Sequence, residues 1–382
     1  MIGFELSEEQ KQWQSTARDF VEKEIKTLAW KIDKGLIEEF HWPLINKMAQ
    51  QGLLSLGVPE KFGGSGLDLL TSAIVVEELA VGDAGIAFTT SLNSFLPLMV
   101  AGTEEQKEEF IPLISNKEKP GLSAFALTEP NAGSDASGVI TSARHEGKHY
   151  VLNGEKCFIS NGDVATLYTV LATVDKAKGV RGITAFLVPW GTEGLSRGKR
   201  ETKMGFHSNH TSTVVLNDVE IPEKNRLGEE GDGFKIAMKV IDVARVLSCG
   251  AVGVGIARAA YEAVLKFLKT HSNPKAVIGQ QAISFQLADM LAAIEASRLL
   301  VWKSGWIFDR GLPAATMISL TKFYASDMAV ELTNRSMQLV GLHGYSEDYP
   351  VDKYVRDAKL LQIYEGTNQI SRLIVSRDIL SN

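Results

Sequence analysis

The sequence predicts a mostly helical α+β protein with three domains: an N-terminal helical domain (residues 1–118), a middle antiparallel, barrel-like β domain (119–230) and a C-terminal four-helix bundle (231–382). Two observations support this. Apolar residues recur at helical spacing up to about residue 118 and again after 231, and they alternate with a period of two in between. The 382 residues are also enough for several domains around a large core.

The N-terminal domain is expected to contain helices over residues 7–30, 41–51, 68–81 and 103–116. The first begins at Ser7, where Ser7-Glu8-Glu9-Gln10 forms a capping box. A glycine-rich segment, residues 62–66, separates the second helix from the third. It lacks the Gly-Lys-Ser/Thr ending of a phosphate-binding loop, so a turn that needs positive φ is the better interpretation.

The middle domain is predicted from β-branched, apolar runs over residues 166–173, 182–188 and 211–216. Asn153-Gly154 follows another such run and predicts a hairpin turn. In the C-terminal domain, helices are expected over 233–269, 278–309 and 313–342, and a shorter fourth completes an antiparallel bundle. A β domain between two helical ones leaves grooves, where ligands usually bind.

Composition argues against several classes of function. The net charge is −6 without a basic stripe, so no nucleic-acid partner is expected. The two cysteines, Cys157 and Cys249, and the scattered histidines match no metal-ligand spacing, so no metal site is expected. The most apolar stretch, Val246–Ala257, is too short to span a membrane, and no signal peptide is recognised. We therefore expect a cytoplasmic protein.

Glu365 is the first candidate for chemistry. It lies between two apolar, helix-forming runs and directly precedes Gly366, which breaks the helix. A carboxylate at such a break would be partly desolvated, which raises its pKa and makes it a better base near neutral pH. The alternative is that Glu365 only caps the helix that begins near Thr367.

Two stretches of the β domain could bind a planar ligand. Residues 125–135 end an apolar strand in a polar, glycine-containing loop, which could bond a heteroaromatic ring edge or a phosphate. Residues 156–162 place Phe158 and Ser160 on one face of a strand, where they could pack against a ring and bond its edge. An ordinary turn and an ordinary half-buried strand remain the alternatives.

Arg245 lies in an apolar run of a long helix, so its charge needs an anionic partner. That partner is either Asp242, three residues earlier, or an outside ligand.

Taken together and in order, these segments resemble the acyl-CoA dehydrogenases, which are FAD-dependent flavoproteins, over nearly the full chain. The resemblance implies that Glu365 removes the α-proton of an acyl-CoA thioester while a hydride leaves the β-carbon for flavin N5, which gives the 2-enoyl thioester. It also implies a homotetramer and electron transfer to an electron-transferring flavoprotein. Some relatives carry the base at the position of Ala244, which cannot act as one, so Glu365 is the only candidate.

The resemblance also assigns binding residues. Arg245 would orient the CoA side of the substrate, and Ser91 would lie in the acyl pocket. The expected substrate contacts are Ser91, Ser134, Asp242, Arg245, Tyr364 and Gly366. The expected FAD contacts are Phe125, Leu127, Thr128, Ser134, Phe158, Ser160, Lys275, Ile278, Gln286, Gln338, Leu342, Thr367 and Gln369.

The chain departs from the family pattern at the adenosine end of the FAD site. Residues 275–281 replace the usual Arg-x-x-Phe-Gly-x-Pro, and Leu342 stands where relatives often have glycine. Three other functions are therefore kept: an enoyl-CoA reductase, a dehydrogenase of carrier-protein thioesters, and a helical scaffold without flavin. Whether the acyl chain is short and straight, branched or alicyclic stays open.

Overall fold

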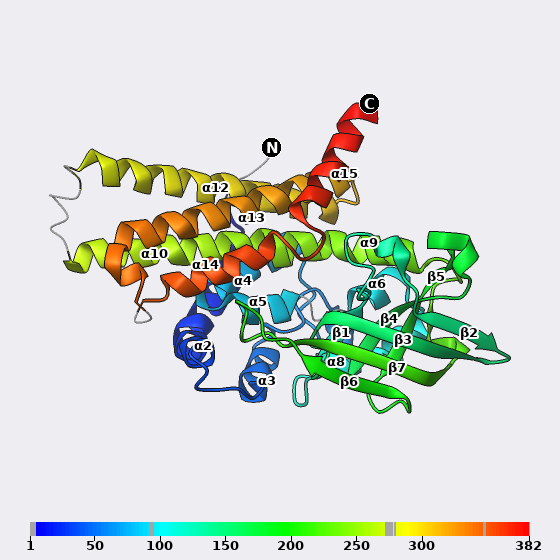
Figure 1. The fold of residues 1–382 in the computed structure, drawn as a ribbon. Helices are drawn as coiled ribbons and strands as arrows, with labels where there is room; N and C mark the ends of the chain where they lie inside the picture. The colour runs from blue at the N-terminus through cyan, green and yellow to red at the C-terminus, as the bar shows by residue number, and fades with distance from the viewer. Residues whose placement is uncertain (1–4, 92–94, 272–277, 279, 347–348, 382) are drawn as a thin grey trace.

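The computed structural model describes residues 5–91, 95–271, 278, 280–346 and 349–381, and in it helices precede and follow a single sheet (Figure 1). The expected mostly helical fold with a sheet in its middle part is confirmed. The first helix starts as predicted, since Gln10 N–H donates to Ser7 Oγ at 3.1 Å. The N-terminal helices are α1 (Glu8–Phe20), the π-helical η1 (Val21–Ile25), α2 (Lys26–Asp33), α3 (Trp42–Gln50), α4 (Leu69–Gly82), α5 (Ala84–Ser91), α6 (Leu96–Ala101), α7 (Glu104–Phe110) and α8 (Pro112–Ser115).

The middle part is an eight-stranded sheet with the order β6-β7-β3-β2-β4-β5-β8, and β1 also pairs with β4. It is not antiparallel throughout, because β1 and β2 both run parallel to β4. A tight turn can join two antiparallel strands, but parallel strands need a longer connection. Accordingly, neither β1 nor β2 is joined to β4 by a tight turn. The strands are β1 (Ser123–Ala126), β2 (Ser142–Glu146), β3 (His149–Ser160), β4 (Leu167–Thr173), β5 (Ile183–Pro189), β6 (Leu195–Arg200), β7 (Thr211–Pro222) and β8 (Arg226–Leu227).

The predicted hairpin turn at Asn153-Gly154 is wrong. Strand β3 runs straight through these residues, and only its register with β7 shifts there, as at a β-bulge. Gly154 is needed because a Cβ atom on it would lie 2.9 Å from Thr141 Cα, not because the chain reverses. The Asn153 amide instead hydrogen-bonds Asp218 of β7 at 2.9 Å. The chain reverses at Gly147, where φ is 67°.

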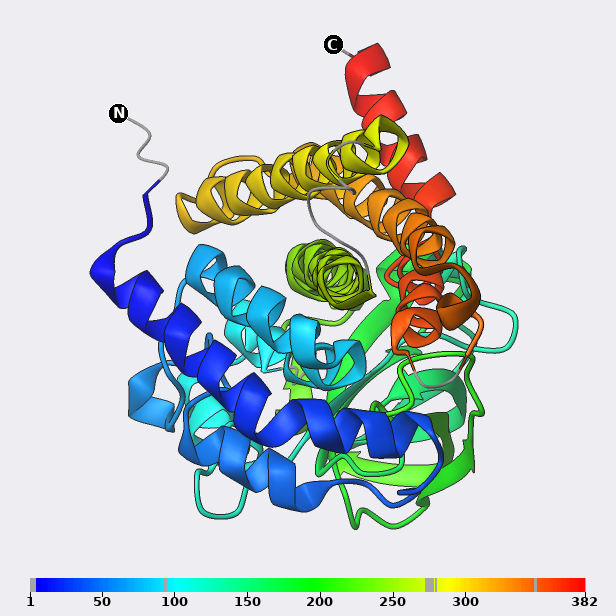
Figure 2. The same cartoon turned by 90° about the vertical axis from the view of Figure 1, so that its left-hand side faces the viewer.

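The C-terminal part is built around one continuous helix, Gly233–His271, which Figure 2 shows end-on among the other helices. It is longer than the apolar stretch noticed in the sequence, and by length and composition it could cross a membrane. However, 89% of its apolar window is buried inside the fold. Its segments and partners are α9 (Gly233–Ala244), the π-helical η6 (Arg245–Ala251), α10 (Val252–His271), α12 (Gln281–Asp309), α13 (Ala315–Val340), α14 (Val351–Leu361) and α15 (Asn368–Ser381).

Buried ion pairs and two apolar clusters join the parts. Glu77 and Glu78 of α4 accept hydrogen bonds from Arg258 of α10, and Arg298 of α12 also donates to Glu77. One apolar cluster is shared by the N-terminal helices and the bundle, and another joins α9 to the sheet. Helix α9 and η6 are therefore fixed between the sheet and the helices, where Arg245 lies.

Candidate functional site

Glu365 lies in the turn between α14 and α15, and its backbone is in the left-handed region with φ 54°. Gly366 follows with φ 82°. For a residue with a side chain this conformation costs energy, and such strain concentrates at functional sites. The capping alternative is wrong, because Thr367 Oγ1 accepts the hydrogen bond from Ile370 N–H in the first turn of α15, at 3.3 Å.

The Glu365 carboxylate is half-buried and receives no hydrogen bond from the residues that the structure describes. Burial raises its pKa to about 7, against the opposing effect of the Arg245 guanidinium and the Lys322 ammonium. A carboxylate with this pKa exchanges a proton readily near neutral pH. These properties suit a general base.

Arg245 holds the backbone of this turn. Its side chain is buried, and its Nε–H donates to the Glu365 carbonyl oxygen at 3.0 Å. Its Nη1 lies 3.3 Å from Asp242 Oδ1, so the pairing three residues apart, one of the two partners predicted for Arg245, is present. Arg245 also begins the π-helical turn η6, an irregularity that is frequent at functional sites.

An aromatic cluster lies beside the base. The Tyr364 ring is 4.7 Å from that of Phe88 and 5.9 Å from that of Phe206, measured between ring centroids. The Tyr364 hydroxyl donates to the Ser248 carbonyl of η6 at 2.6 Å. Ser91, also on α5, is buried and donates to the Phe88 carbonyl at 2.9 Å.

The predicted ring-binding residues of the β domain come together at the ends of β1 and β3. Cys157 N–H donates to the Thr128 carbonyl at 3.0 Å, which joins the two segments. Phe158 has φ 55° and is 65% exposed. The hydroxyls of Thr128 and Ser160 are half-buried and bond no residue in the described part of the chain. An exposed ring beside two free hydroxyls suits a flat heteroaromatic ligand with polar edges.

A buried ion pair supports the segments that carry Thr128, Phe158 and Ser160. Lys156 is fully buried, and its Nζ donates to Glu129 Oε1 at 2.7 Å and to the Leu127 carbonyl at 3.1 Å. The second Glu129 oxygen accepts from Ile140 N–H at 2.8 Å. Of the other predicted contacts nearby, Phe125 is half-buried and Ser134 is exposed.

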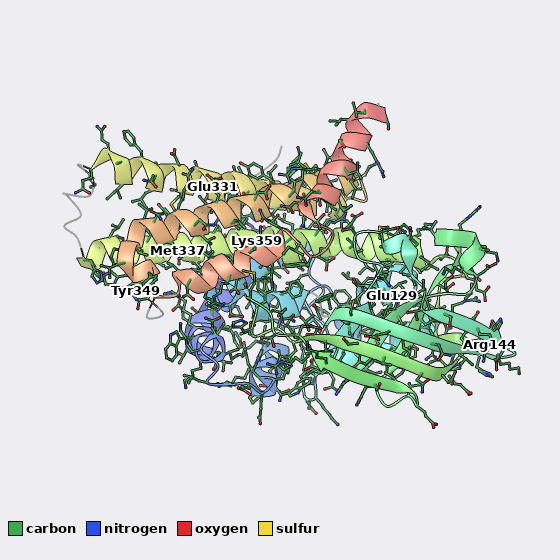
Figure 3. All side chains as sticks on the ribbon, in the orientation of Figure 1. Glu129, Arg144, Glu331, Met337, Tyr349 and Lys359 are labelled. Carbon is green, nitrogen blue, oxygen red and sulfur yellow. The ribbon has the colours of Figure 1, made fainter. Side chains whose placement is uncertain are left out.

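The residues predicted at the adenosine end do not join this group within one chain. Ile278 and Leu342 are 71% and 77% exposed, and Gln338 is exposed. The start of α12, which carries Gln286, and the end of α13 lie at the end of the bundle away from the sheet (Figure 1). Figure 3 shows the same separation between Met337, next to Gln338, and Glu129. Lys275 lies outside the described residues.

Thr367 and Gln369 line a cavity of about 210 Å³ next to the Glu365 turn. The cavity also has both charges in its walls, from Asp327, Lys359 and Arg372. A cavity with hydroxyl, amide and basic groups suits a polar or anionic part of a ligand.

Sequence reasoning missed Lys322 of α13. It is fully buried, and its Nζ donates to Asn368 Oδ1 at 2.7 Å, three residues after the base. The signal was present, because Lys322 follows Ile318 by four residues and precedes Ala325 by three, on the apolar side of the helix.

Comparisons with known proteins match nearly the whole chain. Models of the N-terminal, middle and C-terminal domains of acyl-CoA dehydrogenase match residues 7–118, 124–219 and 231–380. A short-chain specific acyl-CoA dehydrogenase from Megasphaera elsdenii is 42% identical over 99% of this chain and 100% of its own length.

Solved structures are similar over the whole chain. The butyryl-CoA dehydrogenase of M. elsdenii has a TM-score of 0.94 at 41% identity, covering 99% of this chain and all of its own. A chain from a structure described as the electron-transferring flavoprotein of Acidaminococcus fermentans has a TM-score of 0.95 at 40% identity and covers both chains fully.

Proposed function

Since the chain belongs to the acyl-CoA dehydrogenase family, a family of oxidoreductases, we propose that it desaturates a short acyl-CoA thioester between Cα and Cβ, with Glu365 as the base. One observation carries the assignment of the base. The Glu365 carboxylate is desolvated, has no hydrogen-bond donor among the described residues, and stands in a strained turn that Arg245 fixes. Glu365 would take the α-proton, and the thioester would become the trans-2-enoyl thioester.

Removing an α-proton builds negative charge on the thioester oxygen, so the site needs a donor for that oxygen. The backbone N–H of Glu365 has no acceptor among the described residues. It is therefore available to the thioester oxygen, as the family resemblance implies. Arg245 would act indirectly, by holding the Glu365 carbonyl and hence the orientation of this N–H.

FAD is the proposed cofactor, and when bound it supplies the ring that accepts the hydride from Cβ. Leu127, Thr128, Phe158 and Ser160 would hold the ring, because their two free hydroxyls and exposed aromatic face fit its edge and plane. The remaining proposed contacts nearest the ring and diphosphate are Phe125, Ser134, Thr367 and Gln369. The predicted contacts that lie far from these residues would bind the FAD of a neighbouring subunit. They are Ile278, Gln286, Gln338 and Leu342.

A short chain is the proposed substrate class, and an electron-transferring flavoprotein is the proposed acceptor. The support is that full-length relatives are described as short-chain specific. The rings of Phe88, Phe206 and Tyr364 also pack against one another next to the base, and we infer that this packing favours a short acyl chain.

The experiment compares butyryl-, octanoyl- and palmitoyl-CoA as reductants of a dye acceptor by the purified, yellow protein. We expect kcat/KM to be highest for butyryl-CoA by at least about tenfold, the range that a few methylenes decide in an apolar pocket. A colourless protein that stays colourless with added FAD would show a scaffold instead. Reduction of enoyl-CoA without any desaturation would favour a reductase.

A homotetramer is also proposed, and its support is the exposed apolar surface of two helices. Leu299 of α12 is 44% exposed, and Ile379 and Leu380 of α15 are 66% and 85% exposed. Exposed apolar side chains often mark protein interfaces where they form a continuous surface. We expect Leu299→Glu to lower the molar mass in multi-angle light scattering. Leu36 lies between α2 and α3 and is 64% exposed. The same change at Leu36 should leave the molar mass unchanged.

A further inference from the structure

The turn that carries Glu365 rests on helix α13. Lys322 Nζ and Ser326 Oγ both donate to Asn368 Oδ1, at 2.7 and 3.0 Å. Asn368 is the first residue of α15 and is buried, so these bonds fix where the turn ends. A side-chain amide with both groups bonded cannot rotate without breaking several bonds at once.

The same helix also holds the start of the turn. Asp327 Oδ1 accepts from Asn368 Nδ2 at 2.7 Å and from Gln362 Nε2 at 2.6 Å. Asn368 N–H donates to the Gln362 carbonyl at 3.1 Å and closes the loop. Gln362 and Asn368, which flank residues 363–367, are thus both bonded to the Asp327 carboxylate. This arrangement fixes both ends of the turn that carries the base.

Four titratable side chains of the surrounding elements act on the Glu365 carboxylate or lie next to it: Arg245 and Cys249 of η6, Lys322 of α13 and Tyr364 of the turn. Burial raises the pKa of Cys249 to about 12 and that of Tyr364 well above its usual value, so both are neutral. The charges that face the base are therefore two cations.

These two cations differ in how they are compensated. Arg245 has the Asp242 carboxylate at 3.3 Å. The acceptor of Lys322 is a neutral amide, and no carboxylate lies within 4 Å of its Nζ among the described residues. A buried charge without an ionic partner is costly for stability, so its retention calls for another explanation.

We propose that Lys322 is a positioning residue for the base: it fixes the turn through Asn368, and its ammonium favours the ionised form of Glu365. This rests on the proposed role of Glu365. The charge acts through the low-dielectric interior, where a cation favours a nearby carboxylate over the carboxylic acid.

The test is the pH dependence of kcat and kcat/KM for the flavin-loaded Lys322→Met variant. Methionine keeps the length and removes the charge, and Ser326 still bonds Asn368. We expect the acid limb of the profile to move up by about one pH unit, which lowers the rate at pH 7 roughly fivefold. Lys322→Arg should return the limb towards its original position. Ser336→Ala, a buried change on the same helix, should not move it.

An acid limb in the same place, or an equal loss of rate at every pH, would overturn the electrostatic role. If Lys322→Met does not fold, Lys322→Gln is measured in the same way with the same two outcomes. The proposed function itself would fail differently: the wild type would not desaturate butyryl-CoA, or Glu365→Gln would remain active.

Discussion

Glu365→Gln is expected to keep its fold and flavin but to lose desaturation of acyl-CoA by roughly a thousandfold or more, the upper part of the range for removing a general base. Glutamine has the same shape, so the turn and the Arg245 bond to the residue-365 carbonyl can persist. It cannot accept a proton at neutral pH. Stopped-flow reduction of the flavin by butyryl-CoA measures the loss directly. A variant with activity close to the wild type would remove Glu365 as the base.

The pH profile gives the matching control. Burial raises the pKa of Glu365 to about 7, and the base works only when deprotonated, so wild-type activity should rise with pH through about 7. The residual activity of the glutamine variant should lack this limb.

Stability should respond to pH with the opposite sense. The folded pKa lies above the usual 4.5, so the folded protein binds more protons than the unfolded chain between about pH 4.5 and 7. The contribution of Glu365 to stability therefore falls as pH rises through this window. Glutamine does not titrate, so the Glu365→Gln variant lacks this pH-dependent loss. Its free energy of unfolding relative to the wild type, measured by urea unfolding, should increase by up to about 2 kcal/mol from pH 5 to pH 8.

The sequence was sufficient where a local pattern determines the structure. The Ser7 capping box, the long helices and the acid before Gly366 all rest on neighbouring residues, and the structure contains each of them. Asn153-Gly154 shows the limit. The pair is typical of a hairpin turn. However, Thr141 lies against Gly154 in the folded protein, and this contact could not be known before the strands were paired.

The candidate site was harder, because its parts lie far apart in the sequence. Arg245 could be seen to need a partner, but the sequence left Asp242 and an outside ligand open. The structure adds a partner that was not considered, the Glu365 carbonyl, 120 residues away. Lys322 was overlooked because a lone lysine in a long helix is normally at the surface, although its spacing with Ile318 contradicted that.

Arg245→Lys distinguishes the two roles that Arg245 could have. If Arg245 mainly orients the CoA side of the substrate, the variant should raise KM. The contacts seen here point to the base instead, because the guanidinium bonds both the Glu365 carbonyl and Asp242. Lysine keeps the charge but, as a single compact donor, cannot reproduce this forked geometry.

We therefore expect Arg245→Lys to lower kcat by about 10- to 100-fold, equal to roughly 1.4–2.7 kcal/mol, with KM for butyryl-CoA changed much less. Steady-state kinetics with a dye acceptor gives both constants, and flavin content serves as the control for folding. Gly366→Ala should mimic the loss, because a Cβ atom there would lie 3.1 Å from Arg245 Nη2 in a backbone with φ 82°. A variant with raised KM and unchanged kcat would return Arg245 to substrate binding. The loss of kcat would instead mean that the strained turn works only while the guanidinium holds it.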